Sequence, residues 1–332
     1  MKFEEKVQAV LGDFDPSTPP PAIAPVSEGV HRPRWSVMIP TYNCAKFLRR
    51  TLESVLSQAP GPDEMQIEVI DDCSPQDDPE AVVREVGKGR VVFYRKPLNE
   101  GAIPNFNTCV ERSRGELVHI LHGDDWVLPG FYRDVERMAM EHEECALLAT
   151  RCFFVDEAGI ITGLTARLRE LEEGGRTCES FLAGPAIQFA GVVLRRKFFE
   201  QHGGFRCSLV HCADWEMWVR AITQGGGVVS PEVLACYRMF DGNDSGRLMR
   251  SAENLIDRLR LIAVFSAQDT SFPRRKALRL TQEIARQQEL RFTASGDADA
   301  AGANAHVWSI LSSKRERFRR ILGICKRHLL KR

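Results

Sequence analysis

Short apolar runs alternate with amphipathic segments along the chain from Trp35 onward. Residues 35–40 form a short apolar run closed by Pro40, as a buried strand does. Residues 66–72, 90–96, 116–123 and 145–150 predict four further strands. The segments between these runs repeat apolar side chains at helical spacing and predict helices: residues 44–58, 79–87, 103–115 and 129–142. Strands that alternate with helices predict an α/β fold with a mostly parallel sheet flanked by helices.

Later segments continue the pattern with longer helices. Residues 184–205 predict a buried strand, a short helix and a glycine turn, and residues 212–226 predict a helix with two tryptophans in the core. Residues 246–332 read as helical and end in an amphipathic tail with nine Lys or Arg and one Glu after Ser313. Such a tail can lie on an anionic membrane or pack on its own domain, and the sequence leaves both open.

The first 34 residues differ in composition from the rest. The stretch "DPSTPPPAIAP" (15–25) cannot form a helix, because proline removes backbone donors and fixes φ. We therefore expect residues 1–34 to be a Pro-rich flexible lead-in, with a short helix over residues 2–11 at most.

The composition is that of a globular protein: of 332 residues, 43% are apolar and 27% are charged. The formal net charge is zero, which gives no reason to expect nucleic acid as a partner. The ten cysteines form no CxxC pair, which argues against a zinc site and fits reduced thiols. No early apolar run resembles a signal peptide and none is long enough to span a bilayer, so we expect a cytoplasmic protein.

Polar clusters follow three of the expected strands: "PTYN" at 40–43, "IDD" at 70–72 and "GDD" at 123–125. The carboxyl ends of parallel strands meet at one edge of a sheet, where α/β proteins bind ligands. Asp124 and Asp125 are adjacent like charges, and a divalent cation such as Mg²⁺ or Mn²⁺ would remove their repulsion. An isolated DD pair is more typical of a capped turn, but the other two clusters favour a site for a metal and a diphosphate.

Four stretches, in this order, resemble the family 2 glycosyltransferases: "SVMIPTYNCAKFLRRTLESVLSQ", "IEVIDDCSPQD", "LNEGAIPNFNTCVERSRGELVHILHGDDWVLPG" and "CADWEMWVR". Members of this family are inverting, nucleotide-sugar-dependent enzymes with the GT-A fold, which is Rossmann-like. The resemblance implies a GT-A domain over residues 35–245, with a nucleotide-sugar-binding half at 35–125 and an acceptor half at 126–245. The helical region at 246–332 would extend it.

The resemblance also implies roles for individual residues. The first turn of the donor site would consist of Pro40, Thr41, Tyr42 and Asn43. Asp72 would contact the uracil ring, in a loop shaped by Asp71 and Ser74. A second loop would approach the nucleotide-sugar with Asn99, Gly101 and Asn105. By the same likeness Asp124 would reach the ribose side and Asp125 would ligate the metal.

An inverting transfer is a single displacement at the anomeric carbon, so a base must take the proton of the acceptor hydroxyl. The resemblance assigns this role to Asp214, at the start of the expected helix, where Asp is also a common N-cap. Glu216 is the runner-up, although two residues along a helix it points away from Asp214.

The stretch "ACYRMFDGNDS" (235–245) resembles a family segment in which a His is common and, in some relatives, helps to hold the metal or the diphosphate. Phe240 stands at that position here. The remaining cationic groups, Arg238 or Arg247, could meet a phosphate, and surface charge explains them equally well.

Together these residues and the resemblance predict transfer of a sugar from a nucleotide diphosphate, UDP by the resemblance, to a hydroxyl of a glycan or lipid-linked acceptor, assisted by Mn²⁺ or Mg²⁺. A lipid-linked acceptor would suit peripheral contact of the basic tail with the inner face of the membrane. Two alternatives stay open. A nucleotidyltransferase should carry a Gly-rich basic loop that "PTYNCAKF" lacks, and a non-catalytic sugar-nucleotide-binding relative could act as a scaffold.

Overall fold

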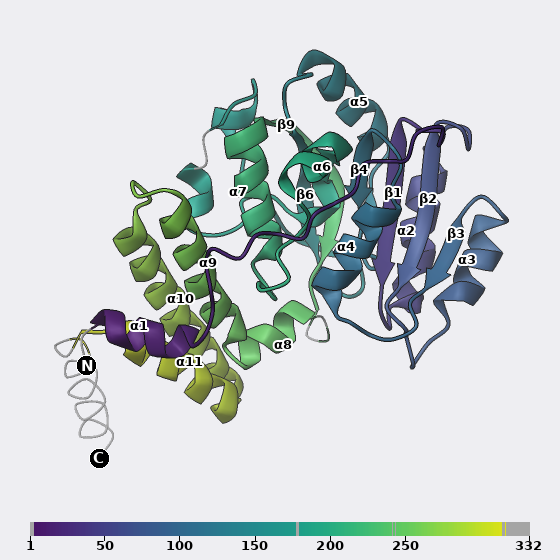
Figure 1. Cartoon of the computed structure of the whole chain (residues 1–332). Helices are drawn as coiled ribbons and strands as arrows, with labels where there is room; N and C mark the ends of the chain where they lie inside the picture. Colours follow the sequence, from purple (N-terminus) through teal and green to yellow (C-terminus); the bar gives the residue numbers. More distant parts are fainter. Residues whose placement is uncertain (1–2, 177–178, 241, 243, 314–315, 317–332) are drawn as a thin grey trace. The chain divides into compact units, whose positions relative to one another are not determined.

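The structure is a computed structural model, and it describes residues 3–176, 179–240, 242, 244–313 and 316 (Figure 1). The chain divides into two compact units. We call residues 19–207 and 213–240 the sheet unit, and residues 1–18, 208–212 and 241–332 the helical unit.

The sheet unit contains one mixed sheet with the strand order β3-β2-β1-β4-β8-β6-β9-β5, and β7 pairs with β6. The strands are β1 (Trp35–Thr41), β2 (Met65–Asp71), β3 (Val92–Arg95), β4 (Leu117–Ile120), β5 (Trp126–Val127), β6 (Leu147–Val155), β7 (Ile161–Leu164), β8 (Val192–Arg195) and β9 (Gly227–Arg238). Strands β1 to β4 are parallel, as are β6 and β9, whereas β8 runs antiparallel to both β4 and β6. The expectation of an α/β fold with a mostly parallel sheet is confirmed.

Helices flank this sheet and close its core (Figure 1). The sheet unit holds α2 (Ala45–Leu56), α3 (Pro79–Gly87), α4 (Ala102–Arg112), α5 (Phe131–Glu141), α6 (Arg196–His202) and α7 (Ala213–Gly225), with short 3₁₀ turns at Arg169–Leu171, Glu179–Leu182 and Phe189–Gly191. Leu48, Leu52 and Val55 of α2 are fully buried against the sheet. Each such side chain contributes about 1.5–3 kcal/mol by leaving water.

The third expected helix ends at Arg112, before Gly115, where the sequence had placed its end. Ser113 is extended, so the helix does not reach Gly115. Gly115 instead lies where two strands approach each other closely. A Cβ at Gly115 would lie 2.5 Å from the backbone nitrogen of Ser36. The Gly115 N–H also donates to Ser36 Oγ at 2.7 Å, so the glycine lets the start of β4 meet β1.

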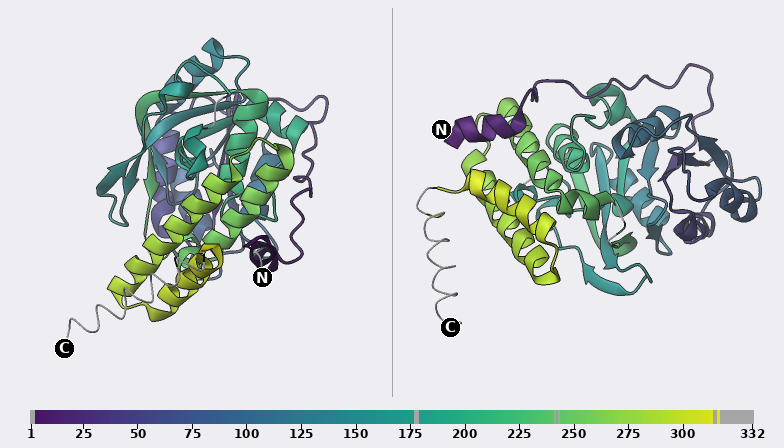
Figure 2. Two further views of the ribbon diagram at one scale, coloured as in Figure 1. Left: turned by 90° about the vertical axis from the view of Figure 1, so that its left-hand side faces the viewer. Right: turned by 90° about the horizontal axis from the view of Figure 1, so that it is seen from below.

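The helical unit holds α1 (Phe3–Leu11), α8 (Asp244–Arg250), α9 (Glu253–Gln268), α10 (Arg274–Ser295) and α11 (Ala298–Leu311). Helices α10 and α11 pack side by side, and α1 contacts α9 and α11 (Figure 2). Within the described ranges, none of the helices has the length and apolar character needed to cross a membrane. Apart from residue 316, the basic tail over residues 314–332 lies outside the described residues.

Candidate active site

The polar clusters that follow β1, β2 and β4 are joined by hydrogen bonds at the carboxyl edge of the sheet. The Asp72 N–H donates to Thr41 O at 2.9 Å, and the Gly123 N–H donates to Pro40 O at 3.0 Å. The Asn43 N–H donates to Ser74 Oγ at 2.9 Å. The expected donor residues of these three clusters therefore lie together.

At the end of β2, two buried aspartates hold neighbouring loops. Asp71 accepts hydrogen bonds from Ser74 Oγ at 2.5 Å and from Arg95 Nε at 2.7 Å. Asp72 accepts from the Gly101 N–H at 2.8 Å and forms an ion pair with Lys96 at 3.1 Å. Asp72 thus fixes the loop that precedes α4, and its contact with a nucleobase stays a prediction.

The other expected donor residues differ in exposure. Tyr42 is 47% exposed, and Asn99 is exposed. Asn105 is buried, donates from Nδ2 to Ile70 O at 3.1 Å, and has no hydrogen-bond partner for its Oδ1. Asn43 adopts φ 50°, a left-handed conformation that Asn tolerates, and its Oδ1 accepts from the Gln76 N–H at 3.1 Å.

The half-buried Asp124 and the buried Asp125 follow β4 and have few partners for two neighbouring carboxylates. Asp125 is 1% exposed, and its Oδ1 accepts from the Arg238 N–H at 2.8 Å, whereas its Oδ2 has no hydrogen-bond partner. Burial raises the pKa of Asp124 to about 6. Burial, and then the neighbouring Asp124 charge, raise the pKa of Asp125 well above its usual range. A cation at this position would relieve both penalties.

His122 completes this cluster, and the sequence analysis missed it. Its Nδ1 lies 4.0 Å from Asp125 Oδ2, and ligand atoms of His122, Asp124 and Asp125 all lie within 4.8 Å of one another. The ring is held between Phe106 and Phe189, with centroid distances of 5.0 and 4.5 Å. Burial lowers the pKa of His122 to about 4, so the ring is neutral and able to ligate a metal. The available signal was its place two residues before Asp124 in "HGDD".

Arg238 of β9 holds the Asp124–Asp125 loop, and Phe240, just after β9, packs on α2. Arg238 Nε donates to Asp124 O at 2.9 Å, and its guanidinium carbon lies 4.2 Å from the centroid of the Phe47 ring. The Phe240 ring packs on Phe47 at 5.4 Å, where the family segment would carry a histidine. Arg247 belongs to α8 of the helical unit and pairs with Asp244 at 2.6 Å.

The two base candidates have different environments at the start of α7. Asp214 lies in the first turn, and its Oδ1 accepts from the Trp215 N–H at 2.7 Å. Trp218, one turn later on the same helix face, packs on Phe189, the ring that also contacts His122. Glu216 is fully buried and paired with two arginines, so it is part of the core.

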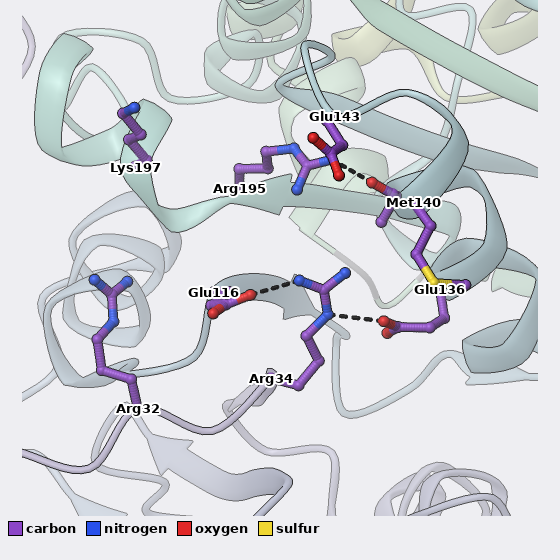
Figure 3. A pocket seen from close by; sticks show the side chains of 9 residues that line it. Arg32, Arg34, Glu116, Glu136, Met140, Glu143, Arg195 and Lys197 are labelled. Carbon is purple, nitrogen blue, oxygen red and sulfur yellow. Dashed lines mark hydrogen bonds and ion pairs between the residues drawn. The ribbon is translucent and has the colours of Figure 1, made fainter.

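A cavity of about 670 Å³ lies elsewhere on the sheet unit (Figure 3). Arg34 directly precedes β1 and Glu116 directly precedes β4, so the cavity lies at the amino ends of these strands. Arg34 pairs with Glu116 at 2.5 Å and with Glu136 at 2.8 Å (Figure 3). The cavity therefore lies at the opposite edge of the sheet from the Asp124–Asp125 pair.

Comparison with known proteins gives one family and several similar structures. A family model described as "Glycosyl transferase family 2" matches residues 36–203. "Uncharacterized protein MT1568" of Mycobacterium tuberculosis is 28% identical over 255 residues, which cover 74% of this chain and 79% of that protein.

Two solved structures share the fold at low identity. Staphylococcus aureus TarS 1-349 in complex with UDP-GlcNAc matches with a TM-score of 0.54 and 15% identity, over 85% of this chain and 92% of that one. Mannosyltransferase PcManGT from Pyrobaculum calidifontis in complex with GDP-Man and Mn²⁺ matches with a TM-score of 0.53 and 16% identity, over 95% and 88%. The expected GT-A fold is confirmed, with α9–α11 as a helical extension.

Proposed function

Because the chain belongs to glycosyl transferase family 2, we propose that it transfers a sugar from a UDP-sugar to a hydroxyl of a glycan or lipid-linked acceptor, with inversion. Membership makes it a nucleotide-sugar-dependent glycosyltransferase; the nucleotide, the acceptor and the stereochemistry belong to the proposal. The observation that carries the proposal is the Asp124–Asp125 pair at the carboxyl edge of the sheet, in which Asp125 is buried and one of its carboxylate oxygens has no hydrogen-bond partner.

The residues of this cluster fit a divalent cation. His122, Asp124 and Asp125 would hold it with one imidazole nitrogen and two carboxylates. This mixed set suits Mn²⁺ better than Mg²⁺, which prefers oxygen ligands alone. The similar Pyrobaculum protein was solved with Mn²⁺. When bound, the cation would offset the negative charge of the departing diphosphate.

Asp214 is the proposed base that accepts the proton of the acceptor hydroxyl as that oxygen attacks the anomeric carbon. Two observations support Asp214 over Glu216. Its helix face is the one that carries Trp218, which packs on Phe189, the ring that also contacts His122. Glu216, by contrast, is fully buried between Arg206 and Arg220 and has no access to a substrate.

UDP is the proposed nucleotide because a similar structure, that of TarS, holds UDP-GlcNAc. The Pyrobaculum protein holds GDP-Man, so the test must include both nucleotides. A cytoplasmic site of action at the inner face of the membrane is part of the proposal. It is supported by the basic tail in the sequence and by the lack of disulfides among the cysteines within the described ranges.

The first experiment is thermal unfolding of the protein with UDP, GDP, dTDP or CMP, each with and without Mn²⁺. Ligand at 100 times its Kd stabilises by about 2.7 kcal/mol, which is a rise in Tm of several degrees at about 2 °C or more per kcal/mol. We expect Tm to rise with UDP plus Mn²⁺ and with none of the other three nucleotides. The Asp125→Asn variant should show no such rise. Equal rises with and without Mn²⁺, or none with any nucleotide, would overturn the proposal.

A non-catalytic sugar-nucleotide-binding relative is the second candidate, favoured by Phe240 in place of a histidine. Hydrolysis of UDP-sugars that depends on Mn²⁺ separates the two, because a binding module shows the shift in Tm without turnover. Asp214→Asn should abolish transfer and keep the UDP-induced rise in Tm. Transfer at the wild-type rate by this variant would refute Asp214 as the base.

A further inference from the structure

A tight turn joins α5 to β6 and carries three side chains with metal-binding atoms. The Cys145 N–H donates to His142 O at 3.1 Å, which closes the turn over His142, Glu143, Glu144 and Cys145. An imidazole, a carboxylate and a thiol therefore project from the first, third and fourth positions.

Two of the three pairs of ligand atoms already lie near the separations that one zinc ion requires. Glu144 Oε1 is 3.7 Å from His142 Nδ1 and 3.6 Å from Cys145 Sγ, and all three lie within 4.8 Å of one another. Tetrahedral zinc, with bonds of about 2.0–2.1 Å to N or O and about 2.3 Å to S, separates its ligand atoms by about 3.3–3.6 Å. Shifts of a few tenths of an ångström would complete these two ligand pairs.

The backbone around the turn is fixed from β8. Arg195 Nε donates to Cys145 O at 2.8 Å, and its Nη2 donates to Ala139 O at 2.7 Å and to His142 O at 3.1 Å. Figure 3 shows the Arg195 guanidinium group beside the carboxylate of Glu143. A turn held at two of its carbonyl groups, with a third held in the preceding helix α5, loses little further freedom when its side chains bind a metal.

Glycines line the space beside the thiol. Gly174 and Gly226 both adopt positive φ, at +82° and +76°. A Cβ at Gly174 would lie 3.2 Å from His142 Nδ1 and 3.4 Å from Cys145 Sγ, and one at Gly226 would lie 3.5 Å from the same sulfur. Hydrogens in place of side chains leave room for an ion next to the nitrogen and the sulfur.

We propose that His142, Glu144 and Cys145 bind Zn²⁺. Thiolate and imidazole ligands select zinc over Mg²⁺ and Mn²⁺, so this site differs in metal preference from the His122 cluster. Glu144 is 71% exposed on its side chain, which leaves the fourth position to water. The thiol gives up its proton to solvent on binding. The ion would join the end of α5 to the start of β6.

The site lies apart from the candidate active site. β6 runs parallel to β9 and, through the antiparallel β8, parallel to β4. The start of β6 is therefore at the amino edge of the sheet, beside the 670 Å³ cavity, which Ala139, Glu143 and Arg195 help to line. The sequence analysis argued against a zinc site because the chain has no CxxC pair. That spacing is only one kind of zinc-binding motif, and it does not include a His-x-Glu-Cys turn.

The test measures metal retention by the full-length protein after chelation, incubation with ZnCl₂ in excess MgCl₂, and gel filtration. In the Asp125→Asn background, which removes a ligand of the His122 cluster, we expect one Zn²⁺ per chain. Glu144→Gln should lower the Zn²⁺ affinity at least tenfold, since loss of an outer-shell partner alone costs 10–100-fold. Glu143→Gln, in the same turn, is the matched control and should retain zinc. Failure of the wild type to retain zinc, or equal affinity in these two variants, would overturn the proposal.

Cobalt provides a second readout that the donor site cannot imitate without a thiolate. Co²⁺ bound to Cys145 should give a sulfur-to-metal charge-transfer band in the near ultraviolet. Cys145→Ser should lose the band, and Cys207→Ser, at an exposed cysteine, should keep it. Circular dichroism of each variant checks that it is folded. A band that survives in Cys145→Ser would assign the metal to another thiol and overturn the proposal.

Discussion

Replacement of Glu216 by Gln should lower the stability of the fold without removing a catalytic group. The Glu216 carboxylate has no exposed surface; its Oε1 accepts from Arg206 Nε at 3.0 Å and its Oε2 from Arg220 Nη2 at 2.9 Å. Arg206 and Arg220 are only 6% and 5% exposed. An amide would remove the negative charge that both buried guanidinium groups face and would turn an N–H group toward a guanidinium donor.

The size of the effect follows from this geometry. Breaking a buried ion pair by removing one partner costs about 3–5 kcal/mol, because the remaining charge cannot return to water. The Gln oxygen still accepts one hydrogen bond, so we expect about 3 kcal/mol. At about 2–4 °C per kcal/mol for a domain of 150–250 residues, Tm should fall by about 6–12 °C.

Calorimetry and UDP-sugar turnover, both measured well below the lower Tm, test the reasoning together. Glu216→Gln should lose stability and keep most of its turnover, whereas Asp214→Asn should keep its Tm and lose turnover. Glu232→Gln, the same change at an exposed residue, controls for net charge. A Glu216→Gln protein with wild-type Tm and no turnover would refute the structural assignment and make Glu216 the base.

Single contacts elsewhere lead to three more expectations. Asp125→Asn should raise or preserve Tm without metal, because it removes a buried charge; calorimetry that shows a lower metal-free Tm would contradict the unpartnered-charge argument. Burial lowers the pKa of His119 in the folded protein to about 3, below its unfolded pKa of about 6.5. The neutral ring therefore stabilises the fold above pH 6.5, and this stability should be lost as the pH falls from 6.5 toward 3, by up to about 1.4 kcal/mol per pH unit. Urea titrations of His119→Gln should show a flatter acid limb, and parallel curves would count against it. Gly115→Ala should cost about 1–3 kcal/mol through overpacking, whereas Gly302→Ala, with open space in α11, should gain about 1 kcal/mol; equal midpoints in urea would refute this pair.

Local pattern was enough to predict the elements of the first half of the chain. The strands β1 and β4 are largely apolar and buried along their whole length, as parallel strands usually are. The order of β1 to β4 made the clusters at their carboxyl ends predictable. The insertion of β8 between β4 and β6, antiparallel to both, was not readable, because pairing between distant segments leaves no periodic signal. Gly115 was misread for a related reason: a helix cap and a close backbone approach both call for glycine, and only the packing partner distinguishes them.

Side-chain partners were the other limit. Glu216 and Asp214 are both acidic residues at the start of one helix, and the sequence could rank them only by resemblance. What separates them is Arg206, ten residues earlier, whose guanidinium reaches Glu216 only in the folded chain. His122 was overlooked because a histidine at the end of an apolar strand is ordinarily a core residue, and its neighbours Phe106 and Phe189 come from distant segments.

The position of His122 bears on how the proposed metal site depends on the rest of the chain. In the family segment around Phe240, a histidine would bring a ligand from a second element, and metal binding would then require that segment to be ordered. Here His122, Asp124 and Asp125 span four residues of one loop, whose backbone Thr51 fixes by donating to Gly123 O at 3.0 Å and to Asp125 O at 2.7 Å. A ligand set on one rigid loop loses less conformational entropy on binding than one assembled from two segments. Mn²⁺ affinity should therefore withstand Phe240→Ala and fall in His122→Ala, and electron paramagnetic resonance of free Mn²⁺ measures both. A loss of Mn²⁺ affinity in Phe240→Ala but not in His122→Ala would mean that the segment after β9, and not His122, contributes to metal binding.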